Sequence, residues 1–181
     1  DVPGRQRPPA DFFLGASAWA SADVSYLAAD RLKGVKSFRA DGTLTAYPAS
    51  FRHVIEMDAG RDHVVMRSES GEVFVSDGIG KPYEFGSVPR DLGPAVAIRA
   101  GTRMSAAQMV DGSWKAWGES TDLINQVREI GPAIDLDLHS DSTKVAYMMW
   151  IEPVAEDSSA GDWTRIERSE SEWQADGLTV R

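Results

Sequence analysis

Apolar and polar residues alternate in short runs between Arg52 and Ser76, and glycines stand between the runs. Val, Ile and Phe favour a pleated, half-buried surface, whereas Gly adopts the positive φ that tight hairpins need. The pattern therefore predicts a three-strand meander of 25 residues. Its runs and the turns between them are Val54–Met57, Gly60, His63–Met66, Ser70-Gly71 and Glu72–Val75.

The chain repeats this pattern in the stretch Pro94–Trp117. Gly101 follows Gly60 by 41 residues, and Gly112 follows Gly71 by the same interval. Two glycines that keep one offset indicate a structural repeat. The repeated extended runs are Val96–Ile98, Ser105–Met109 and Ser113–Trp117.

Two weaker copies flank the clear ones. A later copy begins at Gly131-Pro132-Ala133-Ile134, which echoes Gly93-Pro94-Ala95-Val96 at an offset of 38 residues. The apolar stretch Phe12–Trp19 predicts an extra strand that closes the first blade. The earlier copy is degenerate, and its expected runs and turn are Val24–Leu27, Val35–Phe38, Asp41-Gly42 and Thr43–Tyr47.

Periods near 40 residues that consist of short strands are typical of propeller blades, each of which needs a neighbour to cover its faces. We therefore expect an all-β protein, a β-propeller-like array of about four three- or four-stranded blades that is either incomplete or closed by oligomerisation. The expected division is a tail or linker at 1–10, a repeat domain at 11–167 with copies at about 11–50, 51–92, 93–130 and 131–167, and a C-terminal strand or tail at 168–181.

The repeat resembles that of the regulator of chromosome condensation family, over roughly Asp23 to Ile151. The matching pieces are Asp58-Ala59-Gly60-Arg61-Asp62-His63, Arg99-Ala100-Gly101, Asp111-Gly112 and Trp117-Gly118. In that family each repeat builds one blade of a seven-bladed propeller. This chain lacks the family's Gly-Gln-Leu-Gly stretch after Trp-Gly, and Met104 stands where the family usually has His.

Composition narrows the classes of partner. The net charge of −9 opposes binding to the phosphate backbone of nucleic acids or to anionic membranes, and no apolar run is long enough for membrane insertion. The absence of cysteine excludes disulfides and cysteine–metal sites. The chain begins at Asp1 without Met, which indicates a processed form or an excised domain. The compartment stays open, with an extracytoplasmic bacterial location preferred.

Two connectors between copies carry the candidate ligand contacts, because loops on a rigid scaffold commonly bind. Gly78–Leu92 contains two aromatic residues, and Thr121–Ile130 predicts a short helix, or a turn and a strand, capped by Thr121 or Asp122. Trp114 and Trp117 are expected to face one side of their strand together, either as ligand contacts or as part of the core. The candidate contacts are Tyr83, Phe85, Trp117 and Asp122.

Acidic and histidine residues suggest weaker candidates for chemistry. Asp135, Asp137, His139 and Asp141 occupy alternate positions, but on strand spacing they extend over roughly 20 Å, too far for one ion. We therefore expect no metal and no cofactor. His63 needs a carboxylate such as Asp62 to act as a base, and a structural role is the favoured interpretation.

These features favour a non-enzymatic binding or protein-interaction module whose ligand is a protein segment or a glycan. One alternative is a carbohydrate-active hydrolase or lyase that uses surface carboxylates. Another is a structural spacer domain of a larger bacterial protein. Open sheet edges would also allow homo-oligomers. The carboxylates of the hydrolase alternative are Glu152, Glu156, Asp157 and Asp162.

Overall fold

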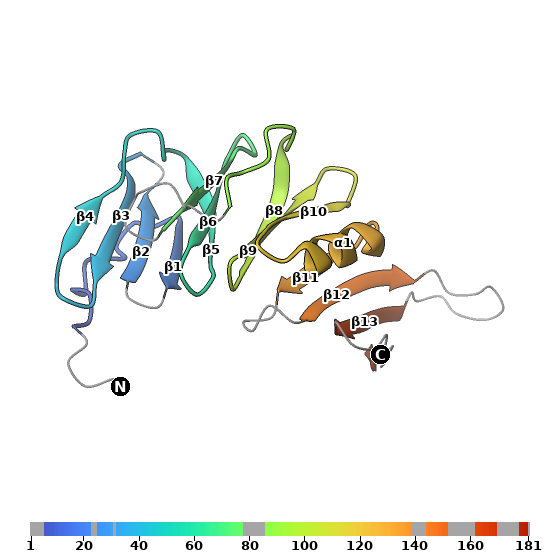
Figure 1. Ribbon diagram of the computed structural model, residues 1–181. Helices are drawn as coiled ribbons and strands as arrows, with labels where there is room; N and C mark the ends of the chain where they lie inside the picture. Colours follow the sequence, from blue (N-terminus) through green and yellow to red (C-terminus); the bar gives the residue numbers. More distant parts are fainter. Residues whose placement is uncertain are drawn as a thin grey trace.

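The structure is a computed structural model that describes residues 6–22, 25–30, 32–77, 86–138, 144–151, 162–169 and 178–180. These residues form four antiparallel sheets and one α-helix, and in each sheet the strands follow one another in chain order. Figure 1 shows the sheets arranged side by side as a fan. This confirms the expected all-β, propeller-like array, and we call the sheets blades 1 to 4 in chain order.

Blade 1 differs from the expected pattern at its start. Its innermost strand, which lies next to blade 2, is β1. The described part of the run expected at Val24–Leu27, from Ser25 on, therefore lies in the second strand and not in the first. The expected strand at Phe12–Trp19 is wrong over its first half, because residues 11–15 form turns. The strands are β1 (Ala18–Ala22), β2 (Ser25–Asp30), β3 (Gly34–Arg39) and β4 (Leu44–Ala46).

Blades 2 and 3 are the two clear copies of the repeat. Gly71 and Gly112 occupy equivalent turns with φ of 84° and 82°, which explains why glycine recurs there. Each turn also accepts a backbone hydrogen bond from the start of the next blade, at 2.9 Å from Ala95 N to Gly71 O and at 3.2 Å from Ala133 N to Gly112 O. The strands are β5 (Val54–Ala59), β6 (Val64–Ser68) and β7 (Val73–Ser76) in blade 2, and β8 (Ala95–Gly101), β9 (Met104–Met109) and β10 (Trp114–Gly118) in blade 3.

The connector after blade 3 is a helix, α1 (Thr121–Ile130). Its N-cap is Ser120, whose hydroxyl accepts from the Leu123 N–H at 3.3 Å, and not Thr121 or Asp122 as expected. The helix packs between β10 and blade 4. Blade 4 contains β11 (Asp135–Leu138), β12 (Lys144–Ile151), β13 (Asp162–Ser169) and β14 (Leu178–Val180), so strand structure extends into the expected C-terminal segment.

The core lies between the blades. Successive side chains of a strand point to opposite faces, so one strand contributes to two interfaces. In β6, for example, Val64 and Met66 face blade 1 whereas Val65 faces blade 3. The buried apolar clusters are Ala20, Leu27, Ala29, Val35, Tyr47, Val54, Val64 and Met66 between blades 1 and 2; Val65, Val73, Leu92, Ala95, Ile98, Ala107, Met109 and Trp117 between blades 2 and 3; and Met104, Ala106, Trp114, Leu123, Val127, Ile130, Ala133, Leu136 and Leu138 around α1 and blade 4.

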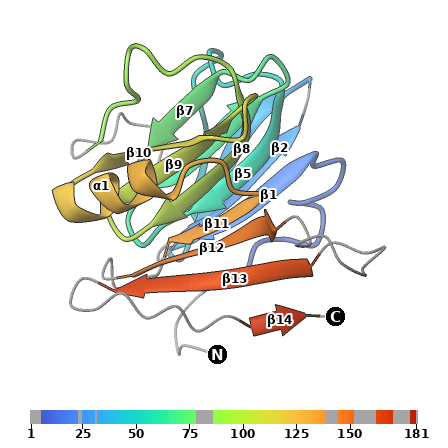
Figure 2. The ribbon, with the colours of Figure 1, turned by 90° about the vertical axis from the view of Figure 1, so that its right-hand side faces the viewer.

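Carboxylates add polar links between the innermost strands. Neighbouring innermost strands lie side by side at the centre of the fan, β5 next to β8 and β8 next to β11 (Figure 2). From β5, the Asp58 carboxylate accepts the backbone N–H of Ala100 at 2.7 Å, and the Glu56 carboxylate accepts that of Ile98 at 3.3 Å. These bonds satisfy donors of β8 that lie outside its own ladder. Among the described residues, no helix has the length and apolar character to cross a membrane.

At Gly60 the backbones of blades 2 and 3 approach closely. A Cβ atom there would lie 2.1 Å from the carbonyl oxygen of Gly101 and 2.6 Å from the His63 ring. We expect Gly60→Ala to lower the free energy of unfolding by about 1–3 kcal/mol through overpacking. Urea denaturation measures this change.

The control is Gly93→Ala, where a Cβ would meet no atom within 4 Å. It should change the free energy of unfolding by no more than about 0.5 kcal/mol. Equal effects of the two substitutions would show that the close contact of Gly60 does not constrain the interface.

Candidate functional site

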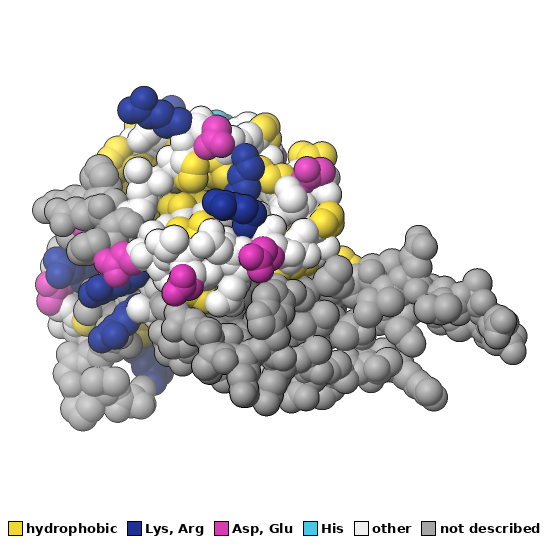
Figure 3. Space-filling model, turned by 45° about the vertical axis from the view of Figure 1, so that its right-hand side comes forward, with side chains coloured by type: hydrophobic (Ala, Val, Ile, Leu, Met, Phe, Trp, Pro, Cys, Tyr) yellow, Lys and Arg dark blue, Asp and Glu magenta, His cyan; other side chains and the backbone are white. Residues whose placement is uncertain are grey.

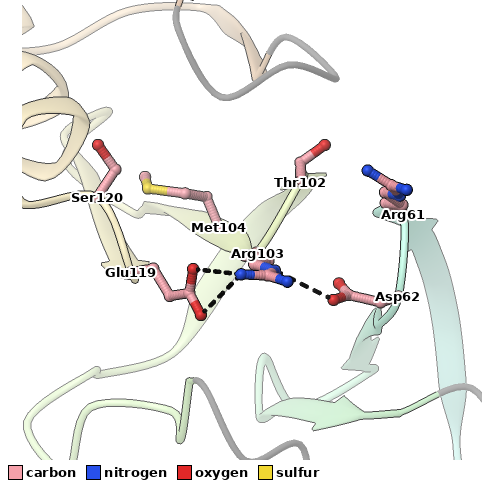
Figure 4. Close-up of a pocket in the computed structure, with 7 residues that line it drawn as sticks. All are labelled: Arg61, Asp62, Thr102, Arg103, Met104, Glu119 and Ser120. Atoms are coloured by element: carbon pink, nitrogen blue, oxygen red, sulfur yellow. Dashed lines mark hydrogen bonds and ion pairs between the residues drawn. The ribbon is translucent and has the colours of Figure 1, made fainter.

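A charged pocket opens where the hairpins of blades 2 and 3 turn next to the start of α1. Its volume is about 510 Å³. The loop between β5 and β6, the loop between β8 and β9, and the link from β10 to α1 each contribute to it (Figure 4). The lining residues are Arg61, Asp62, Thr102, Arg103, Met104, Glu119 and Ser120.

Arg103 joins the two blades at this pocket. It lies in the two-residue turn between Gly101 and Met104 with φ of 52°, a left-handed conformation that costs a non-glycine residue of order 1 kcal/mol. Its Nη1 lies 3.0 Å from Oε2 of Glu119, and its Nε lies 3.6 Å from Oδ2 of Asp62. The guanidinium is therefore held between carboxylates of blade 2 and blade 3.

Arg61 lies where this pocket meets a second cavity of about 490 Å³. The second cavity is bounded by the loop between β5 and β6, by the loop between β8 and β9, and by Leu138 at the end of β11. Arg61 is exposed, and none of the residues that the structure describes forms an ion pair with it. An exposed guanidinium between two cavities is suited to bind a carboxylate of a ligand.

Asp62, His63 and Ser105 have the order of a nucleophilic triad. His63 Nδ1 lies 3.4 Å from Asp62 Oδ1, and its Nε2 lies 3.0 Å from Ser105 Oγ. If Nδ1–H donates to Asp62, Nε2 accepts from the serine hydroxyl. However, His63 is 0% exposed and Ser105 only 3% exposed, so a substrate cannot reach the hydroxyl. Burial also lowers the pKa of His63 below its usual 6.5.

His63 therefore links two blades. Ser105 lies on β9 of blade 3, 42 residues from His63, and the bond between them lies within the interface. The expected structural role of His63 agrees with this geometry. The structural role is to join neighbouring blades.

The structure places Trp117 in the core. It is buried between blades 2 and 3, so it is not an exposed ligand contact as expected. Trp114 is buried on the opposite side, against blade 4, where its Nε1 donates to Ala133 O at 3.0 Å. The expectation that both rings face one side is wrong, because strand residues three positions apart point to opposite faces.

The other candidate contacts remain predictions. Asp122 is exposed in the first turn of α1, two residues beyond Ser120 of the pocket. Tyr83 and Phe85 lie outside the described residues.

The described residues contain no group of three or more His, Cys, Asp or Glu arranged to hold a metal ion. Asp135 instead forms an ion pair with Arg99 of blade 3 at 2.5 Å, and Asp137 is exposed. His139 and Asp141 lie outside the described residues, as do three of the carboxylates of the hydrolase alternative, Glu152, Glu156 and Asp157. The fourth, Asp162, is the first residue of β13.

Comparison with solved structures identifies the fold. The chain is 15% identical to the CRINKLY WD40 ectodomain of the Arabidopsis thaliana receptor kinase ACR4, with a TM-score of 0.54 over 90% of this chain and 52% of that one. Human WBSCR16 gives 12% identity and a TM-score of 0.56 over 92% and 54%. The structure of Kap60 bound to yeast RCC1 (Prp20) gives 12% identity and 0.51 over 82% and 43%. The fold is that of a β-propeller.

The chain spans about half the length of the first two of these structures. No family model and no curated protein matches its sequence. The likeness at these identities describes the fold and leaves the activity to be argued from the site.

The sequence contains one signal for the pocket, which is the repeat interval itself. Arg61 and Asp62 lie 41 residues before Thr102 and Arg103, the same interval that separates the repeat glycines. Equivalent loops of adjacent blades lie side by side in a propeller, so polar residues at equivalent loop positions converge. The pairing of Arg103 with Glu119 has no such periodic signal.

The buried His63 makes stability depend on pH. Its folded pKa is below the unfolded value of 6.5, so the unfolded chain binds more protons as pH falls below about 6.5. The stabilising effect of the neutral ring is complete above this pH and is lost below it, by up to about 1.4 kcal/mol per pH unit. Between pH 7 and 5, we expect His63→Gln to lose less stability than the wild type, as measured by urea denaturation.

The control for this experiment is His53→Gln, at an exposed position. This variant should retain the acid loss because His63 remains in place. The same slope in the wild type and in His63→Gln would contradict the assignment.

Proposed function

We propose that this chain is a non-enzymatic, protein-binding module of the propeller type, and that the charged pocket holds an extended segment of the partner. The observation that carries the proposal is Arg61, an exposed cation at the junction of two cavities on the loop end of the blades. We also propose that the repeats are of the regulator of chromosome condensation type, which their sequence resembles.

The chemistry of the pocket favours a polypeptide that carries a carboxylate. Arg61 is exposed on the rim of the pocket, where its guanidinium can form an ion pair with a carboxylate of the ligand. Cavities of about 510 and 490 Å³ on either side of Arg61 suit neighbouring side chains of one extended segment.

The distribution of charge supports a protein partner. Figure 3 shows Lys and Arg side chains interspersed with Asp and Glu on the face that it presents. Mixed charges of this kind suit complementary protein surfaces, whereas a polyanion would require a basic patch. In the yeast structure of the comparison, RCC1 (Prp20) is bound to another protein, Kap60.

The site favours binding over catalysis. Its two carboxylates, Asp62 and Glu119, both contact the guanidinium of Arg103, so neither is directed at an open position as an acid or base. The triad-like serine beside the pocket is buried. A glycan ligand has less support, because Trp117 lies in the core and none of the described residues that line the pocket is aromatic.

A peptide display library, selected on the protein, tests the proposal. We expect enriched peptides to contain Asp or Glu and to lose affinity for Arg61→Glu by about tenfold or more, since hydrogen bonds to charged groups contribute about 1.5–3 kcal/mol. Isothermal titration with one enriched peptide measures the change.

Arg90→Glu is the matched control, because Arg90 is also exposed and lies outside the pocket. It changes the net charge by the same amount and should leave the affinity of the peptide within a factor of about two. Equal losses in the two variants would indicate nonspecific attraction, and binding confined to a glycan array would contradict a protein ligand.

A further inference from the structure

Blade 1 has one face that no other blade covers. The interior blades have a neighbour on each side, and the three interfaces between successive blades bury apolar clusters. Blade 1 stands at one end of the fan and blade 4 at the other (Figure 1). In a closed propeller the two end blades would meet, because the blades surround a central axis.

The outer face of blade 1 is apolar and only partly covered. The segment before β1 packs Phe12 and Phe13 against it, with ring centroids of Phe12 and Phe38 at 5.9 Å and of Phe13 and Trp19 at 6.0 Å. This added layer leaves a cavity of about 390 Å³, lined in part by Phe12, Leu14 and Leu44.

The added layer is not a polar cap. Terminal units of repeat proteins normally present a polar outer face to water. Here the side chains of Leu14, Trp19 and Leu44 are 81%, 65% and 63% exposed, and they all belong to this end of the fan. Large exposed apolar side chains that gather on one face indicate an interaction surface.

The size of the fan suggests what covers this face. The described blades correspond to about half of the propeller chains in the ACR4 and WBSCR16 structures. A second fan of the same size would bring the number of blades to eight, which is enough to surround a central axis. In a two-fold arrangement, blade 1 of each copy meets blade 4 of the other, so the two junctions are identical and no end remains open.

The two ends of the chain carry complementary charge. Residues 1–50 contain six basic and five acidic residues, whereas residues 131–181 contain four basic and eleven acidic residues. The formal charges are thus +1 for residues 1–50 and −7 for residues 131–181. Lys33 and Lys36 line the cavity on the face of blade 1. Opposite charges favour contact between unlike ends over contact between like ends.

We propose that the outer face of blade 1 binds blade 4 of a second copy of this chain, so that two four-blade fans close one propeller. This inference is independent of the proposed ligand, which binds at the loop ends of blades 2 and 3.

Light scattering coupled to size exclusion, over a concentration series, tests the dimer. The expected result is a mass that approaches about twice 19.7 kDa as concentration rises. The dissociation constant should increase with salt because the ends attract through charge. A monomer at every concentration up to the solubility limit would overturn the proposal.

Variants locate the interface. Leu44→Asp adds a charge to an exposed site on the outer face and should weaken the dimer by about tenfold or more. Leu14→Asp should have the same effect from the turn before β1, outside the sheet, so the two variants would not share one folding defect. Val110→Asp, at a 79% exposed position in blade 3, is the matched control and should dimerise like the wild type.

Circular dichroism and thermal unfolding of each variant confirm that it is folded. A dimer whose affinity is unchanged in both Leu44→Asp and Leu14→Asp would place the contact elsewhere and overturn the proposal. A dimer weakened equally by Val110→Asp would do the same.

Discussion

The structure depends on the burial of both faces of each small sheet. A three-stranded antiparallel sheet with apolar side chains on both sides cannot cover itself, and it becomes stable only against neighbours. In β6, Val64 and Met66 pack into the interface with blade 1, whereas Val65 packs into the interface with blade 3. The same requirement explains why the repeats stack in chain order and why the two ends of the fan differ from its interior.

Tight stacking at the loop ends also creates the candidate site. Gly60 allows its loop to approach the backbone of Gly101, and the bond from His63 to Ser105 joins the two blades beneath that contact. The close approach brings Asp62 of one blade to Arg103 of the next, and Arg103 in turn reaches Glu119. The pocket is therefore built across an interface, and its shape depends on how the two blades pack.

The proposed protein-binding role and the proposed dimer use different parts of the fan. The ligand site lies at the loop ends of the two central blades, whereas dimerisation would use the flanks of the terminal blades. Closure of the ring would fix the spacing of the central blades more firmly, since each blade would then have a neighbour on both sides. Under these proposals, a change at either flank could alter binding only through the packing of the blades between them.

The sequence by itself determined the repeat, its strands and its turns. These features are local, because alternation favours strands and the positive φ of Gly71 and Gly112 requires residues that accept it. The spacing of Leu123, Val127 and Ile130 in the sequence is likewise that of a helix, and all three lie on the buried side of α1.

Only the tertiary structure decided which neighbour each residue meets. It placed β1 innermost in blade 1, separated Trp114 and Trp117 onto opposite faces, and paired His63 with a serine 42 residues away. Periodicity predicts which face of a strand is buried, but both faces of an interior blade are buried here. The choice between core and ligand contact therefore depends on how neighbouring sheets pack, which no local pattern encodes.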